Sequence, residues 1–143
     1  MTTTPSAATT GAWLVDASVA VKWFLPVDRE PQGELAREAI GRLAMRTSSL
    51  AFYEVGNVLT LHSGWPPPRV AKALELLRDV CGDPVELLAE DYLTAVELAS
   101  AHDLTFYDAS YAAIARRLGR GLLSADTDLL APGLASDLEA ALA

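Results

Sequence analysis

The segment AWLVDASVAVKWF, residues 12–24, carries the clearest indication of the fold. Its first four residues, Ala12–Val15, form an apolar run with the length of a short buried strand. Asp16 follows directly, and Asp is among the residues that are most favourable at a helix N-cap. Residues 17–24 continue as a helix that ends before Pro26, because proline cannot continue a helix interior. The stretch therefore predicts a strand, then a carboxylate, then a helix.

The rest of the chain repeats this alternation of strand and helix. Apolar residues at helical spacing predict helices at 32–46, 52–62, 69–81, 91–102 and 108–118. Short apolar runs predict further strands at 47–50, 85–88 and 122–124. Strands that alternate with helices indicate an α/β protein with three layers, α/β/α, around a mainly parallel central sheet. In such sheets, ligands bind at the edge where the carboxyl ends of the strands meet.

Length and composition indicate one globular domain. The chain has 143 residues, of which 51% are hydrophobic and 21% charged, so it can bury a core. We expect one domain over residues 12–143 and a disordered tail over residues 1–11, which lack the basic start and apolar stretch of a signal peptide. No apolar run is long enough for a membrane helix. Cys81 is the single cysteine, so an internal disulfide is excluded and a cytoplasmic location is expected.

The charge balance narrows the possible functions. Eleven Lys and Arg against nineteen Asp and Glu give a net charge of −8. This excludes a protein that coats nucleic acid by bulk positive charge, and also a basic helix on a membrane surface. A nucleic-acid enzyme that offsets phosphate charge with metal ions remains compatible. Two His and one Cys are too few for a closed zinc site.

Four acidic residues stand in apolar surroundings close to strand ends or helix starts. Asp16 and Asp126 each follow an apolar strand, in WLVDASV and LLSADTD. Glu54 lies in the predicted first turn of its helix in AFYEVGNVL, and Asp108 begins a helix in TFYDASYAAIA. Any single Asp of this set is explained well as a helix cap. Their joint placement predicts instead that the carboxylates converge at the carboxyl edge of the sheet.

Converging carboxylates would need a cation. Two of them about 5 Å apart repel by about 3 kcal/mol at an effective dielectric constant near 20. Such a site either raises the pKa of some of its members or binds cations. Carboxylate oxygens without His or Cys suit Mg²⁺ or Mn²⁺. The chemistry that this arrangement favours is hydrolysis of a phosphodiester.

Four motifs, taken in chain order, resemble those of PIN-domain ribonucleases and, more narrowly, of the VapC toxins of bacterial toxin–antitoxin pairs. They are VDASVAVKWF, YEVGNVL, YDASYAAIA and SADTDLL, which together span residues from about 13 to 130. The resemblance implies a PIN-like domain and a Mg²⁺- or Mn²⁺-dependent endoribonuclease that cuts RNA, often tRNA or rRNA. It also implies a homodimer that a cognate VapB-like antitoxin neutralises, in a type II toxin–antitoxin system.

The resemblance also assigns roles to residues of this chain. The positions that match the acidic quartet of the family, which is catalytic and binds the metal, are Asp16, Glu54, Asp108 and Asp126. The positions that match polar residues supporting the quartet are Ser18, Ser124 and Asp128.

Two further groups of residues are less specific. Arg116, Arg117 and Arg120 follow the helix of Asp108 and are candidates for contacts with RNA phosphates. Ordinary helix-end cations would look the same, because Arg near a helix C-terminus complements the helix dipole. Phe106 and Tyr107 precede Asp108 and could stack on an RNA base, but we expect them in the core.

Two alternatives to the nuclease remain open. Phosphotransfer on an aspartate, as in haloacid-dehalogenase-like phosphatases or receiver domains, suits Asp16. However, Ala17 and Ser18 follow it, so the DxD signature is missing, and no late-strand Lys is present. The second alternative is a non-catalytic PIN-like scaffold that binds a protein through its helices and uses the acids only as caps. Titration with Mn²⁺ separates this scaffold from a nuclease.

Overall fold

The computed structural model describes residues 11–143, so the predicted N-terminal tail lies, apart from Gly11, outside the described residues. The first half of the described chain contains β1 (Ala12–Val15), α2 (Ala17–Ala20), the 3₁₀ turn η1 (Val21–Trp23), α3 (Gly33–Arg42), β2 (Ala44–Thr47), α4 (Ser49–His62) and α5 (Pro67–Cys81). The second half contains the 3₁₀ turn η2 (Ala89–Asp91), α6 (Tyr92–His102), α7 (Phe106–Leu118), β3 (Gly121–Leu123), α8 (Thr127–Leu130) and α9 (Leu138–Leu142). Strands and helices alternate as the sequence predicts.

The three strands of the described chain form one parallel sheet in the order β2-β1-β3. Val15, the last residue of β1, pairs with Thr47 of β2 and with Leu123 of β3. The three strands therefore end level with one another. The residues that follow them emerge side by side at one edge of the sheet, which we call the carboxyl edge.

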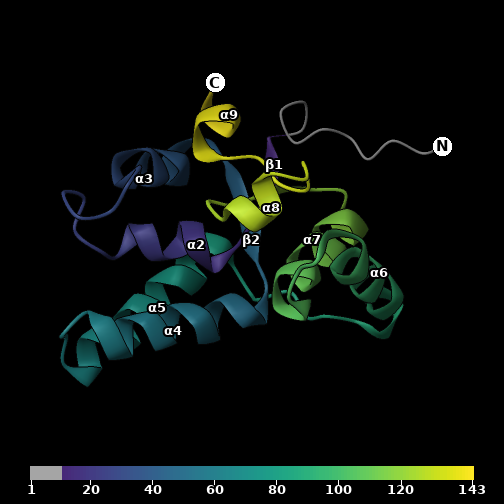
Figure 1. The fold of residues 1–143 in the computed structure, drawn as a ribbon. Helices are drawn as coiled ribbons and strands as arrows, with labels where there is room; N and C mark the ends of the chain where they lie inside the picture. Colours follow the sequence, from purple (N-terminus) through teal and green to yellow (C-terminus); the bar gives the residue numbers. More distant parts are fainter. Residues whose placement is uncertain (1–10) are drawn as a thin grey trace.

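The two faces of the sheet are covered by different helices. Successive residues of a strand point to opposite faces. Trp13 and Val15 accordingly join a core with residues of α2, α3, α4 and α5, whereas Leu14 joins a second core with residues of α6 and α7. Figure 1 shows α6 and α7 together on one side of the strands and α2, α4 and α5 on the other. The predicted three-layer α/β/α arrangement is confirmed.

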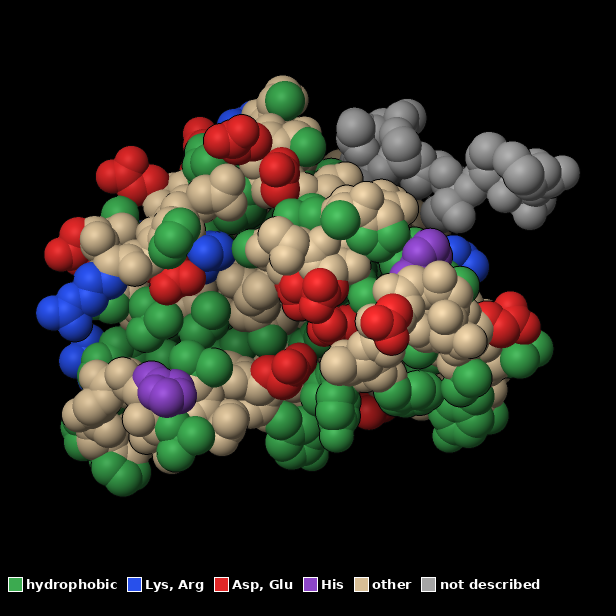
Figure 2. Space-filling view, viewed as in Figure 1, with side chains coloured by type: hydrophobic (Ala, Val, Ile, Leu, Met, Phe, Trp, Pro, Cys, Tyr) green, Lys and Arg blue, Asp and Glu red, His purple; other side chains and the backbone are tan. Residues whose placement is uncertain are grey.

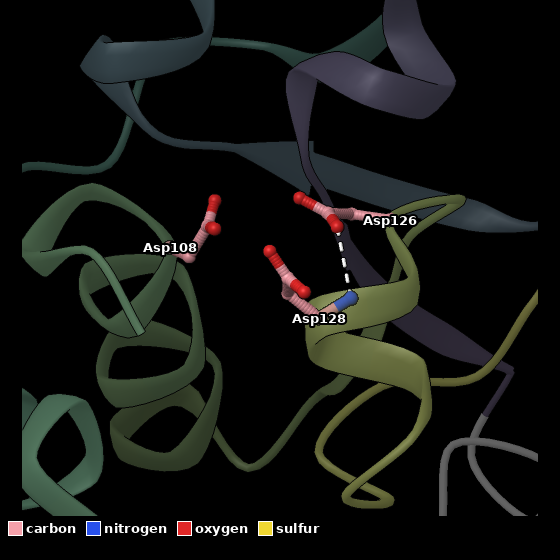
Figure 3. A group of neighbouring side chains, drawn as sticks. All are labelled: Asp108, Asp126 and Asp128. Atoms are coloured by element: carbon pink, nitrogen blue, oxygen red, sulfur yellow. Dashed lines mark hydrogen bonds between the residues drawn. The ribbon is translucent and has the colours of Figure 1, made fainter. Parts of the chain in front are cut away.

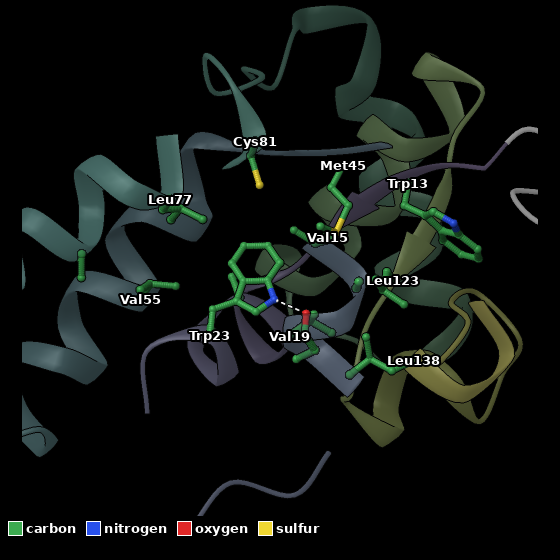
Figure 4. Close-up of a cluster of buried hydrophobic side chains, with 14 of the residues drawn as sticks. Trp13, Val15, Val19, Trp23, Met45, Val55, Leu77, Cys81, Leu123 and Leu138 are labelled. Atoms are coloured by element: carbon green, nitrogen blue, oxygen red, sulfur yellow. Dashed lines mark hydrogen bonds between the residues drawn. The ribbon is translucent and has the colours of Figure 1, made fainter. Parts of the chain in front are cut away.

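The larger of the two cores holds the segment that carries Asp16. Figure 4 shows Trp23 near the centre of this core, between side chains from the sheet and from α4 and α5. Its indole Nε1 donates to the carbonyl oxygen of Ala36 at 2.7 Å, so the buried ring keeps a hydrogen-bond partner. Burial of a large apolar side chain contributes about 1.5–3 kcal/mol. Packing therefore fixes α2 and η1 directly after Asp16.

The position of β2 differs from the prediction. The helix expected over residues 32–46 ends at Arg42, and the strand expected over residues 47–50 lies at Ala44–Thr47. Met45 and Thr47 are buried while Ala44 and Arg46 are more exposed, which is the two-residue period of an edge strand. Four residues are too few to distinguish this period from the last turn of a helix.

The strand predicted at residues 85–88 is reduced to a single bridge. Val85 pairs in parallel with Ser48, just beyond the end of β2, and the pairing stops there. Beyond this point the chain is held by a side chain rather than by the sheet, because Arg117 Nη2 donates to the carbonyl oxygen of Glu86 at 2.9 Å. The sheet of the described chain therefore has three strands and not four.

The remaining helices lie close to their predicted places. The observed bounds are Pro67–Cys81 for α5, Tyr92–His102 for α6 and Phe106–Leu118 for α7. Gly119 ends α7 in the left-handed conformation, as its place in the sequence predicts. Between residues 11 and 143, no helix is both long and apolar enough to cross a bilayer.

Candidate active site

Two of the predicted acids lie at the carboxyl edge and also cap helices. Asp16 follows β1 directly, and its Oδ1 accepts a hydrogen bond from the Val19 amide at 3.3 Å at the start of α2. Asp126 follows β3 after two residues, and its Oδ1 accepts from the Asp128 amide at 2.9 Å at the start of α8. The capping role and convergence at one edge are therefore both present, and neither excludes the other.

Asp108 does not begin its helix, as the sequence suggested. Helix α7 starts at Phe106, and Thr105 is its N-cap: the Thr105 hydroxyl accepts from the Asp108 amide at 3.1 Å. Asp108 is thus the third residue of the helix. This position still lies in the first turn, where the helix dipole favours a negative charge.

Three carboxylates form a tight group between α7 and α8. Asp108, Asp126 and Asp128 each offer one oxygen, and these three oxygens all lie within 4.8 Å of one another. Figure 3 shows Asp108 on α7 facing Asp126 and Asp128 at the start of α8, with the three side chains pointing toward one another. Asp128, predicted only as a supporting residue, therefore lies as close to this group as the two quartet members.

Glu54 approaches the group from α4 but does not join it. Helix α4 begins at Ser49, so Glu54 is its sixth residue and lies in the second turn, not in the predicted first. The charge of Glu54 contributes to the raised pKa of Asp108. Its Oε1 accepts a hydrogen bond of 2.7 Å from the hydroxyl of Tyr111 on α7. The helix α4 thus brings a fourth carboxylate within electrostatic range.

Asp16 is the most buried of these acids, with 3% of its surface exposed. Its Oδ1 accepts from the Ser18 hydroxyl and its Oδ2 from the Ser124 hydroxyl, both at 2.5 Å. Ser18 in turn accepts from the Ala125 amide at 2.9 Å, and Ser124 accepts from the Asp126 amide at 3.0 Å. The two serines therefore join the chain after β1 to the chain after β3, and they hold Asp16 in one orientation.

Electrostatics in this region favour the arrival of a cation. Burial raises the pKa of Asp16 to about 6; hydrogen bonds from Ser124, Ser18 and Val19 oppose the shift, and the charge of Asp126 adds to it. Burial also raises the pKa of Asp108, and the charges of Asp126, Glu54 and Asp128 add to that shift. None of the ion pairs recorded between residues 11 and 143 involves any of these acids. A hard divalent ion with oxygen ligands fits this donor set.

The three arginines predicted to contact RNA, Arg116, Arg117 and Arg120, lie away from the acidic group. Arg117 Nε donates to both carboxylate oxygens of Asp91, at 2.9 and 3.0 Å. Arg120 donates to the carbonyl oxygens of Trp13 in β1 and Ala44 in β2, which lie near the amino ends of these strands, at the edge of the sheet opposite to the acids. Arg116 is exposed, but eight residues of α7 separate it from Asp108, which is about 12 Å of helix. The structure therefore gives two of the three arginines structural partners.

Exposed aromatic side chains lie on the surface next to Glu54. Phe106 and Tyr107, expected in the core, are 43% and 64% exposed, and Tyr53 on α4 is 76% exposed. Burial on α7 begins only after Asp108, because the first residues of the helix extend beyond its neighbours. Tyr53 and Tyr107 line a groove of about 380 Å³ together with Glu54. Figure 2 shows acidic side chains in the middle of this face and hydrophobic ones below them.

The fold and the acidic carboxyl edge define a class of protein, and comparison with known families agrees with it. The model of the PIN domain matches residues 13–133, and the chain belongs to the PIN-domain family. The resemblance seen in the four sequence motifs is thereby confirmed.

Individual relatives sharpen this assignment. The chain is 34% identical over 120 residues to Ribonuclease VapC3 of Pyrobaculum aerophilum. The aligned region covers 81% of this chain and 90% of that protein. The crystal structure of PAE2754 from the same organism is similar, with a TM-score of 0.66 and 27% identity over 92% of this chain and 95% of the other. A toxin–antitoxin complex from Klebsiella pneumoniae contains a chain with a TM-score of 0.67, covering 87% of this chain and 96% of that one. Its identity of 14% shows the shared fold alone.

Proposed function

We propose that this protein is a divalent-metal-dependent endoribonuclease and the toxin of a type II toxin–antitoxin pair. The observation that carries the proposal is the acidic group at the carboxyl edge. Asp108, Asp126 and Asp128 bring oxygens within 4.8 Å of one another, beside the buried Asp16, without a cation from the described chain. The relative named as a ribonuclease, with its 34% identity, supports RNA as the substrate.

The residues of this site have two kinds of role, which are to bind the metal ion and to orient the residues that bind it. Asp108, Asp126 and Asp128 would hold Mg²⁺ or Mn²⁺ between α7 and α8, with Asp16 and Glu54 facing the ion from β1 and α4. When bound, the ion supplies an acidified water and offsets phosphate charge during hydrolysis. Ser18 and Ser124 hold Asp16 with its two oxygens fixed, so its orientation requires no rearrangement when the ion binds. The catalytic quartet that we propose is therefore Asp16, Glu54, Asp108 and Asp126.

The substrate that we propose is structured cytoplasmic RNA, tRNA or rRNA, as the resemblance to VapC toxins implies. Among the three predicted arginine contacts, Arg116 lies on the surface, and its side chain has no recorded hydrogen bond in the described chain. An RNA strand that reaches both Asp108 and Arg116 would follow α7 for about 12 Å. The net charge of −8 disfavours phosphate binding, and a divalent ion at the acidic group would offset this repulsion locally.

Incubation with total RNA tests this function. Wild-type protein loaded with Mg²⁺ or Mn²⁺ should cut RNA at defined sites, which sequencing of the new ends would map, and EDTA should stop the reaction. Asp16→Asn should be inactive, whereas Glu97→Gln, which changes an exposed acid on α6, should cut normally. Cleavage by Asp16→Asn at the wild-type rate, or cleavage in EDTA, would show that the acidic group is not the catalyst.

We further propose that the protein forms a homodimer through an aromatic face and that a VapB-like antitoxin is its other partner. The aromatic face consists of Tyr53, Tyr92, Leu93, Val96 and Tyr107, which are 53–76% exposed. Tyr53 and Tyr107 line one groove, α6 packs against α7, and exposed apolar patches often mark protein–protein interfaces.

The oligomeric state in solution tests the homodimer. Light scattering should give the mass of a dimer for the wild type and of a monomer for a Tyr92→Glu, Val96→Glu double variant. Leu61→Glu, a change at an equally exposed position of α4 outside the aromatic face, should remain dimeric. A wild-type monomer at high concentration would rule out a second copy as the occupant of this face.

A further inference from the structure

A buried tyrosine links three of the elements that build the acidic site. Tyr111 is 1% exposed and is the largest fully buried side chain of the described residues. Its hydroxyl donates to Glu54 Oε1 at 2.7 Å. The hydroxyl oxygen of Tyr111 itself accepts a hydrogen bond from the backbone N–H of Ala17, the residue directly after Asp16. One hydroxyl group therefore joins α7 to α4 and to the chain that follows β1.

The position of Tyr111 in α7 relates the Glu54 carboxylate to Asp108 on the same helix. Asp108 and Tyr111 are three residues apart, so they lie on the same face of the helix. The ring of Tyr111 is packed in the second core with Leu14 and Ile114, and it cannot turn away. A hydrogen bond from this ring therefore fixes Glu54 relative to Asp108, although the two acids stand on different helices.

Glu54 has the properties of a ligand that needs such support. It is a long side chain on the partly exposed part of α4, and fixing such a chain costs about 1.5–2 kcal/mol of rotamer entropy. The bond from Tyr111 is the single hydrogen bond recorded for its carboxylate in the described residues, and it uses only Oε1. Oε2 remains available to a cation. Tyr111 thus orders Glu54 before the cation binds, so binding costs less.

We propose that Tyr111 is a positioning residue of the site, which acts on metal binding through Glu54. This inference rests on the proposed function, because it concerns the same metal. Nothing in the four sequence motifs pointed to it. In TFYDASYAAIA the tyrosine stands among small and apolar residues and resembles an ordinary core position. The available signal was its spacing, one turn after Asp108.

Tyr111→Phe separates the hydroxyl from the ring. The ring keeps its packing, and Glu54 loses its hydrogen bond. Changes in groups that orient metal ligands typically reduce metal affinity 10- to 100-fold, so calorimetry of the full chain should show Mn²⁺ binding about 10-fold weaker than in the wild type. Ser100→Ala, which removes an exposed hydroxyl from α6, is the control and should bind Mn²⁺ normally.

A thermal unfolding cycle without metal tests whether the effect passes through Glu54. The midpoints of the wild type, Tyr111→Phe, Glu54→Ala and the double variant are compared in EDTA. The shift caused by Tyr111→Phe should be clearly smaller in the Glu54→Ala background, because one of the two hydrogen-bond partners of the hydroxyl is already gone.

The outcomes distinguish this inference from the proposed function. Failure of the wild type to bind Mn²⁺ would overturn the proposed function and the role of Tyr111 together. Normal binding by the wild type and unchanged affinity in Tyr111→Phe would overturn the positioning role alone. An equal thermal shift with and without Glu54 would show that the hydroxyl serves only the core.

Discussion

Two aspartates of this protein are equally buried, at 3% exposure, but the chain treats them differently. Asp91 lies at the start of α6, and both of its carboxylate oxygens accept hydrogen bonds from Arg117 Nε. Its Oδ2 also accepts a hydrogen bond from the Leu88 amide at 2.9 Å. Asp16, at the end of β1, receives bonds from two serine hydroxyls and one amide. The charge of Asp91 is therefore balanced by Arg117, whereas Asp16 has only neutral hydrogen-bond donors and lacks a counter-charge.

The difference predicts opposite responses to the loss of charge. Removing one partner of a buried ion pair leaves the other partner unpaired and is strongly destabilising. Removing a buried charge that has no counter-charge takes away an unfavourable interaction, as the raised pKa of Asp16, about 6, indicates. Asp91 is therefore expected to serve stability, and Asp16 to serve activity at the expense of stability.

The largest expected effect is the loss of RNA cleavage in Asp16→Asn. The amide keeps the size of the carboxylate, and the serine hydroxyls can turn to bond it, so the fold should persist. Without the charge, the metal loses an essential partner, and the rate should fall by at least about 1,000-fold, within the range known for removal of single catalytic residues. Cleavage rates are measured per folded protein, with circular dichroism as the check. A rate within 10-fold of the wild type would remove the distinction between the two aspartates.

The second effect is a dependence of stability on pH in the metal-free protein. The pKa of Asp16 rises from 3.8 to about 6 on folding, so the folded state binds this proton more tightly than the unfolded state. Its contribution to stability is present below about pH 4 and is lost as the pH rises through about 6, amounting to about 3 kcal/mol.

Urea unfolding in EDTA from pH 4 to pH 7.5 measures this loss. Asp16→Asn lacks the titrating group, so the difference in unfolding free energy between variant and wild type should grow in favour of the variant as the pH rises. A difference that stays constant over this range would show that Asp16 is ionised in the folded protein even at low pH.

The third effect concerns the paired aspartate. Asp91→Asn should lower the free energy of unfolding by about 2 kcal/mol, less than the 3–5 kcal/mol of a fully buried pair, because the Arg117 side chain is 21% exposed and can reach water. Its Mn²⁺ affinity should match that of the wild type. Asp83→Asn removes an exposed pair with Arg78 and should cost less than about 1 kcal/mol. Weaker Mn²⁺ binding by Asp91→Asn would mean that the two regions are coupled.

The same comparison explains what the sequence predicted. Acids that follow short apolar strands, such as Asp16 and Asp126, were placed at the carboxyl edge, because strand order and helix start are local patterns. The pair of Asp91 with Arg117 spans 26 residues, and no local pattern carries it. The bond between Tyr111 and Glu54 spans 57 residues and depends on how α4 and α7 pack.

Helix and strand boundaries failed for a related reason. Helix α4 begins three residues before its predicted start, which moves Glu54 from the first turn to the second. Phe106 and Tyr107 were expected in the core because of their size. Their exposure follows from the position of α7 relative to its neighbours, and the composition of the segment does not encode it.

The fourth and weakest effect concerns the two serines that donate hydrogen bonds to Asp16. Ser124 is fully buried and provides the strongest of the hydrogen bonds that lower the pKa of Asp16, ahead of Ser18. Ser124→Ala should therefore move the titration of Asp16 to higher pH than Ser18→Ala does. It should also cost about 1 kcal/mol of stability, the usual contribution of one hydrogen bond. Carbonyl-edited NMR of the Asp16 carboxyl carbon would follow both titrations without metal. A larger shift in Ser18→Ala would mean that the Ser18 hydroxyl in α2, rather than the fully buried Ser124, controls this carboxylate.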